Sequence, residues 1–115
     1  MLIKKFEDIV AWQKAQGLAL EVYSIFKSSK DFGFRDQICR ASVSISSNIA
    51  EGFDRSSDAD FSRFIYMSLS SCSEVKSLTY LAEHLGYTST TQTKSLLSKV
   101  NEISKIIRGL IKSIK

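Results

Sequence analysis

The chain has 115 residues, of which 43% are hydrophobic and 24% are charged, and its formal net charge is +4. These are ordinary globular proportions, and a chain of this length can bury roughly two thirds of its unfolded surface, which suffices for one core. No run of about 20 apolar residues is present, which excludes a membrane-spanning helix, so we expect a soluble, single-domain protein.

The N-terminal segment, Met1 to Asp8, has too short an apolar run for a signal peptide and no small-residue cleavage site, so we expect a cytoplasmic location. The first helix is predicted over about residues 8–27, with Asp8 as its N-cap. Its apolar residues recur at helical spacing: Ala15, Ala19, Val22 and Phe26.

A second helix is predicted over about residues 34–53, after a polar break at 28–33. One apolar stripe runs along it at steps of three and four residues: Ile38, Ala41, Ile45, Ile49 and Gly52. A polar stripe with the same steps lies beside it: Gln37, Arg40, Ser44, Asn48 and Glu51.

Ser57, followed three residues later by Asp60, resembles a capping box and opens a third predicted helix over about residues 58–85. Gly86 is suited to the left-handed position that ends this helix. The same capping pattern at Ser89 and Gln92 opens a fourth helix over about 90–114. Apolar stripes continue along both helices: Phe61, Ile65, Ser68, Cys72, Val75, Leu78, Ala82 and Leu85, and then Leu96, Val100, Ile103, Ile107, Leu110 and Ile114.

Connections this short make consecutive helices antiparallel. Four apolar stripes are then buried together most simply in an up-and-down bundle. We therefore predict an all-α, antiparallel up-and-down four-helix bundle that spans residues 1–115 as one domain.

The segment from Gln37 to Arg55 resembles the hallmark of the 23S rRNA intervening-sequence proteins, also called the four-helix bundle protein family. Its core, Asn48-Ile49-Ala50-Glu51-Gly52, is specific because bundle patterning alone does not place polar Asn and Glu so near an apolar stripe. Trp12, shortly after the Phe6-x-Asp8 start, and the run Ser71-Cys72-Ser73-Glu74 agree with that family. Members of that family usually carry glycine or alanine at the position of Ser70, and we expect only a local packing change from the serine.

The resemblance implies a four-helix protomer that often assembles as a homopentamer, with the genes of some members lying inside 23S rRNA genes. Similar proteins accompany the reverse transcriptases of diversity-generating retroelements, where the resemblance implies a basic pentameric barrel that engages nucleic acid and the polymerase. It identifies no reaction, and a genomic position within an rRNA gene does not imply membership of the ribosome.

The polar stripe of the second helix has a structural interpretation. An antiparallel pairing about the turn at 54–57 sets Glu74 near Gln37 and Arg40, and Arg63 near Asn48 and Glu51. We therefore predict two charge-assisted contacts that fix the register, Arg40 with Glu74 and Arg63 with Glu51 or Asn48. The residues assigned to this structural or interface role are Gln37, Arg40, Ser44, Asn48, Glu51, Gly52, Arg55, Arg63, Ser71 and Glu74.

Catalytic patterns are missing from the sequence. His84, the one histidine, is placed near the end of the third helix, where a cation suits the helix dipole. Cys39 and Cys72 lie in apolar-periodic segments, which indicates buried free thiols rather than a disulfide or a zinc site. We expect no enzyme, no cofactor and no metal, with one alternative left open: a pocket that uses Glu51, Glu74 and Arg40.

The fourth helix provides the main functional lead. From Lys94 onward six bases oppose a single acid, Glu102. Five of these bases fall within an arc of roughly 80°, centred roughly 140° from the apolar stripe. They are Lys94, Lys105, Arg108, Lys112 and Lys115.

An ordinary solvated face explains such a stripe equally well. In a homo-oligomer, repeated stripes would strengthen the positive electrostatic potential and could bind the phosphate backbone of RNA or DNA without base-specific contacts. The leading hypothesis is a non-enzymatic homo-oligomer, of five copies by the resemblance, that binds nucleic acid non-specifically or docks an acidic protein such as a reverse transcriptase, with no membrane partner. A protein–protein adaptor with no nucleic-acid role is the first alternative, and an unrecognised enzyme is the second.

Overall fold

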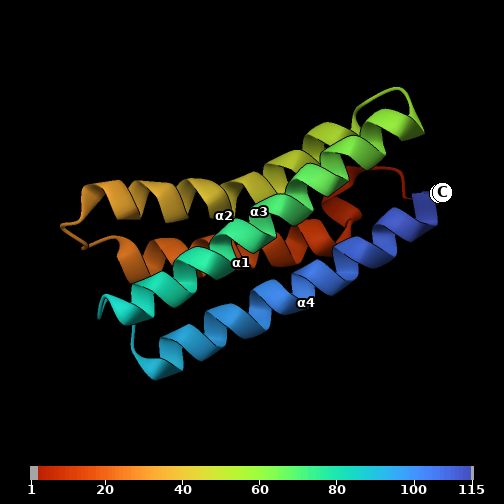
Figure 1. Ribbon diagram of the computed structural model, residues 1–115. Helices are drawn as coiled ribbons and strands as arrows, with labels where there is room; N and C mark the ends of the chain where they lie inside the picture. Colours follow the sequence, from red (N-terminus) through yellow and green to blue (C-terminus); the bar gives the residue numbers. More distant parts are fainter. Residues whose placement is uncertain (1–2, 115) are drawn as a thin grey trace.

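The computed structural model describes residues 3–114, and four α-helices make up most of this stretch (Figure 1). A short 3-10 turn, Phe6–Asp8, precedes α1, Val10–Phe26, and then come α2, Phe32–Phe53, α3, Asp58–His84, and α4, Thr90–Ile114. The predicted all-α class is confirmed, and each predicted helix agrees with the observed one to within about two residues, the usual uncertainty of a helix end.

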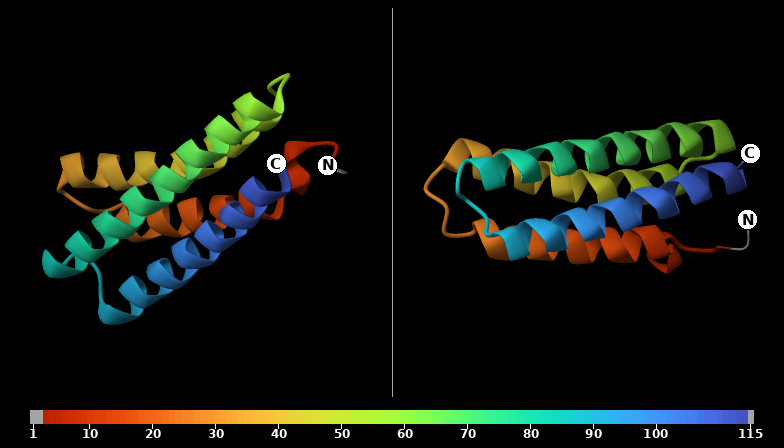
Figure 2. Two further views of the ribbon diagram at one scale, coloured as in Figure 1. Left: turned by 45° about the vertical axis from the view of Figure 1, so that its right-hand side comes forward. Right: turned by 60° about the horizontal axis from the view of Figure 1, so that its bottom comes forward.

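The four helices form an up-and-down bundle with extents of 43 × 22 × 19 Å. Figure 2 shows both termini and the α2–α3 connection at one end, and the α1–α2 and α3–α4 connections at the other. Each helix packs against its neighbours in the chain, and α4 closes the bundle against α1. None of the helices in residues 3–114 combines the length and the apolar character that a membrane crossing would need.

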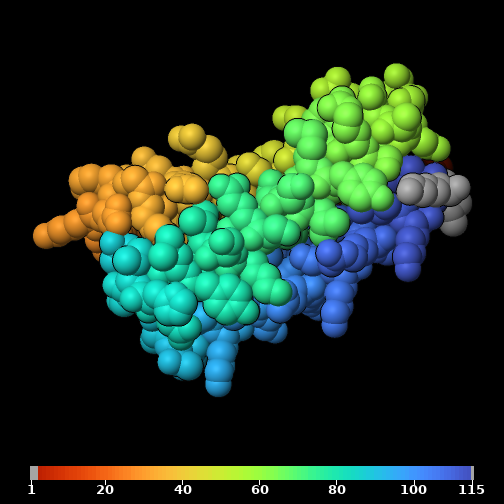
Figure 3. Space-filling model, in the orientation of Figure 1, coloured from red at the N-terminus to blue at the C-terminus, as the bar shows by residue number. Residues whose placement is uncertain are grey.

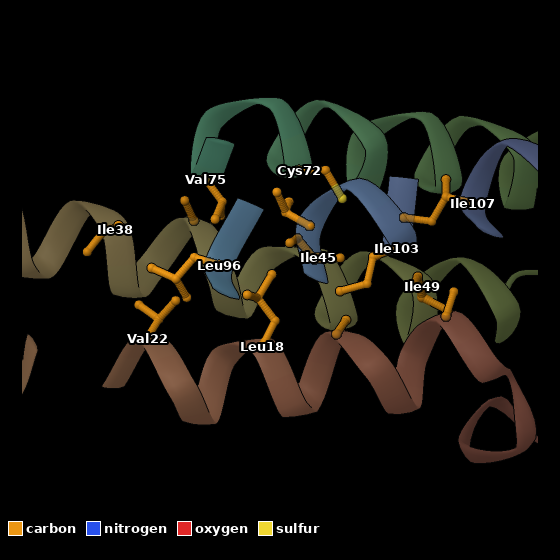
Figure 4. Packing of buried hydrophobic residues seen from close by; sticks show 14 of the residues in the cluster. Leu18, Val22, Ile38, Ile45, Ile49, Cys72, Val75, Leu96, Ile103 and Ile107 are labelled. Carbon is orange, nitrogen blue, oxygen red and sulfur yellow. The ribbon is translucent and has the colours of Figure 1, made fainter. Parts of the chain in front are cut away.

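Apolar side chains from all four helices meet along the axis of the bundle (Figure 4). The predicted stripes supply most of them, including Ile38, Ile45 and Ile49 of α2 and Ile103 and Ile107 of α4. Leu85, predicted at the end of the third stripe, is instead 48% exposed because it lies just beyond α3. Burial of this apolar surface is the main force that holds the helices together.

Cys39 and Cys72 are both free and buried, as predicted. Cys72 is 1% exposed, and burial raises the pKa of its thiol to about 11. Because the thiolate is the reactive form, Cys72 is a core residue rather than a nucleophile.

The predicted ends of the last two helices are confirmed. Ser57 Oγ accepts the N–H of Asp60 at 3.1 Å at the start of α3. Ser89 and Gln92 exchange two bonds at the start of α4, of 2.9 and 3.1 Å, which is a full capping box. Gly86 has a φ of 78° and ends α3 in the left-handed conformation.

The predicted N-cap of α1 is wrong. Asp8 lies in the 3-10 turn, and Ile9 precedes the helix without any side-chain capping bond. The helix begins at Val10, two residues later than expected, so the carboxylate of Asp8 is no longer at the capping position. Instead, Asp31 caps α2, which begins two residues earlier than expected, and its Oδ1 accepts the N–H of Phe34 at 3.2 Å.

Asp31 also joins the two connections at one end of the bundle. The hydroxyl of Tyr87, between α3 and α4, donates to Asp31 Oδ2 at 2.6 Å, and the Tyr87 ring packs edge-on against Phe34 with centroids 5.4 Å apart. The bond from Tyr87, followed by the bond from Phe34 N–H, lowers the pKa of Asp31. The same Tyr87–Asp31 bond raises the pKa of Tyr87.

We expect Tyr87→Phe to lower the Tm at neutral pH and to leave it unchanged in strong acid. Because the folded pKa of Asp31 lies below its unfolded value, the stabilisation is complete above the unfolded pKa and is lost as the pH falls through the folded one. On the alkaline side it is lost as the pH rises through the raised pKa of Tyr87. Circular dichroism melts of both proteins across pH measure this, and a pH-independent difference in Tm would contradict the assignment.

Candidate functional site

The polar stripe of α2 lies beside α3 and is satisfied mainly within its own helix. Ser44 Oγ donates to the carbonyl of Arg40 at 3.0 Å, and Asn48 Nδ2 donates to the carbonyl of Ser44 at 2.8 Å. Gln37 and Glu51, at the two ends of the stripe, are exposed. The stripe is therefore partly exposed to solvent and does not form a buried polar network.

The two predicted charge pairs do not form. Arg40 and Glu74 line one depression between α2 and α3, so the predicted register is right, but both are exposed and they make no ion pair. Arg63 pairs with Asp60 one turn away, at 3.7 Å, instead of with Glu51 or Asn48. An exposed ion pair contributes at most about 1 kcal/mol, too little to hold long side chains across a helix interface.

Gly52 and Ser68 bring α2 and α3 together instead. A Cβ built at Gly52 would lie 2.6 Å from the Cβ of Phe64, so the family-motif glycine allows the two helices to touch. One helical turn further along α3, the buried hydroxyl of Ser68 donates to the carbonyl of Ile45 at 2.7 Å. The sequence places Ser68 within the apolar stripe of the third predicted helix. Its hydrogen-bond partner on α2 depends on the register of the two helices.

Two arginines cover the ring of Phe64 near the α2–α3 turn. The guanidinium carbon of Arg55 lies 4.6 Å from the ring centroid, and that of Arg63 lies 4.8 Å from it. Both arginines therefore make cation–π contacts with a ring at the α2–α3 interface. Ser71 has a local role, since its hydroxyl donates to the carbonyl of Met67 at 3.2 Å.

The basic stripe of α4 is exposed on the bundle surface. Lys94, Lys105, Arg108 and Lys112 all point to solvent, and Lys115 lies outside the described residues. On the side of α4 that faces α1, charges are compensated: Lys99 pairs with Glu21, and Glu102 with Lys14 at 3.4 Å. The stripe itself contributes to no ion pair within residues 3–114.

Residues 7–109 match the 23S rRNA-intervening sequence protein family. The chain belongs to this family. It is also similar to a crystal structure of a protein with unknown function from the S23 ribosomal protein family of Bacteroides thetaiotaomicron. The TM-score is 0.84 at 27% sequence identity, over 90% of this chain and 99% of that one. No curated protein matches the chain.

Neither the intervening-sequence family description nor the solved relative names a reaction. In this member, residues 3–114 contain no group of three or more His, Cys, Asp and Glu side chains that could hold a metal ion. His84 is exposed at the last position of α3, as predicted. Glu74 and Arg40 share a depression that Glu51 does not line, so the three residues of the alternative catalytic pocket are not brought together.

Aromatic side chains that sequence analysis did not assign to a surface are exposed. Tyr80 of α3 and Tyr23 of α1 are both half-exposed, and Tyr87 is engaged with Asp31. They lie outside the predicted apolar stripes, but a helical wheel alone does not separate a half-buried tyrosine from an exposed one.

Proposed function

We propose that this intervening-sequence protein is a non-enzymatic homo-oligomer that binds RNA or DNA non-specifically through the basic surface of α4. The observation that carries the proposal is the set of four exposed cations on that helix with no carboxylate partner in the described chain. Cations in this state attract the phosphate backbone and release its condensed counterions on binding.

Self-assembly is supported by exposed apolar side chains on the α1–α2 face. Leu20 is 72% exposed, and Tyr23 and Val43 line a depression between α1 and α2 together with Arg40. Large apolar side chains left exposed in a single protomer can be covered by another copy in an assembly. Five copies, as the family resemblance implies, would repeat the α4 stripe around one ring.

Light scattering coupled to size exclusion, followed by fluorescence anisotropy with labelled RNA and DNA oligonucleotides, tests this proposal. We expect a mass that is five times that of the protomer. We also expect similar affinities for oligonucleotides of different sequence, because phosphate contacts carry no sequence information. A monomeric mass would contradict the assembly, and strong preference for one sequence would contradict non-specific backbone binding.

A protein–protein adaptor is the second candidate, and exposed apolar residues on α3 favour it. Met67 and Leu81 are each nearly half exposed there. In that case the cations of α4 would serve solubility only, and the exposed apolar residues would carry the contact with the partner. Failure to bind any oligonucleotide at low salt, in a protein that still assembles, would favour the adaptor.

A further inference from the structure

A groove of about 270 Å³ separates α3 from α4 on the surface of the bundle. Figure 3 shows the two helices side by side, with long side chains of α4 projecting from the surface. The polar residues that line the groove come from both helices: Ser73, Lys76, Asn101, Ser104, Lys105 and Arg108. Cys72, buried at its base, is the remaining lining residue.

The charge of the groove is entirely positive. Lys76, Lys105 and Arg108 line it, no carboxylate does, and none of the three forms an ion pair within residues 3–114. Lys76 is half-buried and is the cation that α3 contributes to the groove. Three cations around one hollow repel one another until an anion joins them.

The lining is suited to one phosphate group. Arginine forms paired hydrogen bonds with phosphate oxygens, lysine provides a point charge, and the amide of Asn101 is a neutral donor. No aromatic side chain lines the groove, so it has no surface on which a base could stack. These features favour the backbone of a nucleic acid over its bases.

We propose that the α3–α4 groove binds a phosphodiester of a nucleic-acid backbone between Lys76 of α3 and Lys105 and Arg108 of α4. The inference rests on the proposed function and adds to it a cation from a second helix. Lys112 lies one turn beyond Arg108, about 6 Å further along α4, so a strand leaving the groove meets another cation. That continuation favours a polymer over a free phosphate compound.

Lys76→Ala provides the test because Lys76 lies outside the α4 stripe. We expect it to weaken binding of a labelled single-stranded RNA about fivefold at roughly 0.1 M salt, the same loss that we expect for Lys105→Ala, and to reduce the salt slope by about 0.7. Lys30→Ala is the matched control, since Lys30 lines a different depression, between α1 and the α3–α4 connection, and should leave affinity unchanged. Circular dichroism melts confirm that each variant folds.

The outcomes separate this inference from the proposed function. If Lys105→Ala weakens binding and Lys76→Ala does not, the proposed groove site is overturned, whereas the proposed binding by the α4 surface is supported. If the wild-type chain binds no oligonucleotide, both are overturned. Inorganic phosphate and a nucleoside monophosphate serve as competitors. If either displaces the RNA at an equal concentration of phosphate groups, the conclusion that the ligand is a polymer is overturned.

Discussion

Gly52→Ala is expected to destabilise the protein by about 1–3 kcal/mol, the range typical of overpacking in a core. The new Cβ would lie 2.6 Å from Phe64 Cβ and 3.3 Å from the carbonyl oxygen of Phe61. Neither is the free end of a flexible side chain, so α2 and α3 must separate to make room. Alanine favours a helix over glycine by about 1 kcal/mol, which offsets only part of this cost.

Gly17→Ala and Gly109→Ala are matched controls for this prediction. Both glycines lie within helices, and an added Cβ meets nothing within 4 Å at either position. We expect each to stabilise the protein by up to about 1 kcal/mol. Urea unfolding of the three variants at one protein concentration measures the signs, and a stabilising Gly52→Ala would show that α2 and α3 do not approach closely at the motif.

Replacing Lys105, Arg108 and Lys112 together by alanine is expected to have the largest effect on function. Each lost contact to a single strand lowers affinity about fivefold at roughly 0.1 M salt, so three contacts give a loss on the order of 100-fold. All three side chains are exposed and unpaired within residues 3–114, so the fold should be unaffected. Anisotropy titrations of the variant and the wild type measure the ratio.

The control for the triple variant removes cations that are already neutralised. Lys14 and Lys99 pair with Glu102 and Glu21 on the side of the bundle where α1 meets α4. Replacing both by alanine lowers the net charge without touching the stripe, so we expect a much smaller loss of affinity. Losses of binding free energy in the ratio of the charges removed, three to two, would mean that net charge, rather than the α4 surface, controls binding.

The bundle could be predicted because the sequence features that specify it lie close together along the chain. Apolar stripes at steps of three and four residues set the helices and their buried faces, and short connections set the topology. The caps at Ser89 and Gly86 followed from residue type and spacing. The start of α1 was not predictable in the same way, because a 3-10 turn at residues 6–8 displaced Asp8 from the helix end.

The candidate site was only partly predictable because it depends on contacts between helices. The register that brings Glu74 beside Arg40 could be predicted, but their side chains lie in solvent, where a weak ion pair does not hold them. Lys76 could not be predicted from the basic stripe, because that stripe contains residues of the fourth helix alone. Only the packing of α3 against α4 places Lys76 in the same groove as Arg108. The role of Gly52 needed the distance to Phe64.

The salt dependence of RNA binding by the wild-type chain tests the central claim most directly. If exposed cations of α4 contact the phosphate backbone, the logarithm of the association constant falls linearly with the logarithm of salt concentration. Contacts from Lys105, Arg108 and Lys112 alone predict a slope of about −2, at about −0.7 for each phosphate of a single strand, and contacts from further cations or protomers make it steeper. A slope near zero, or no binding at low salt, would contradict the account.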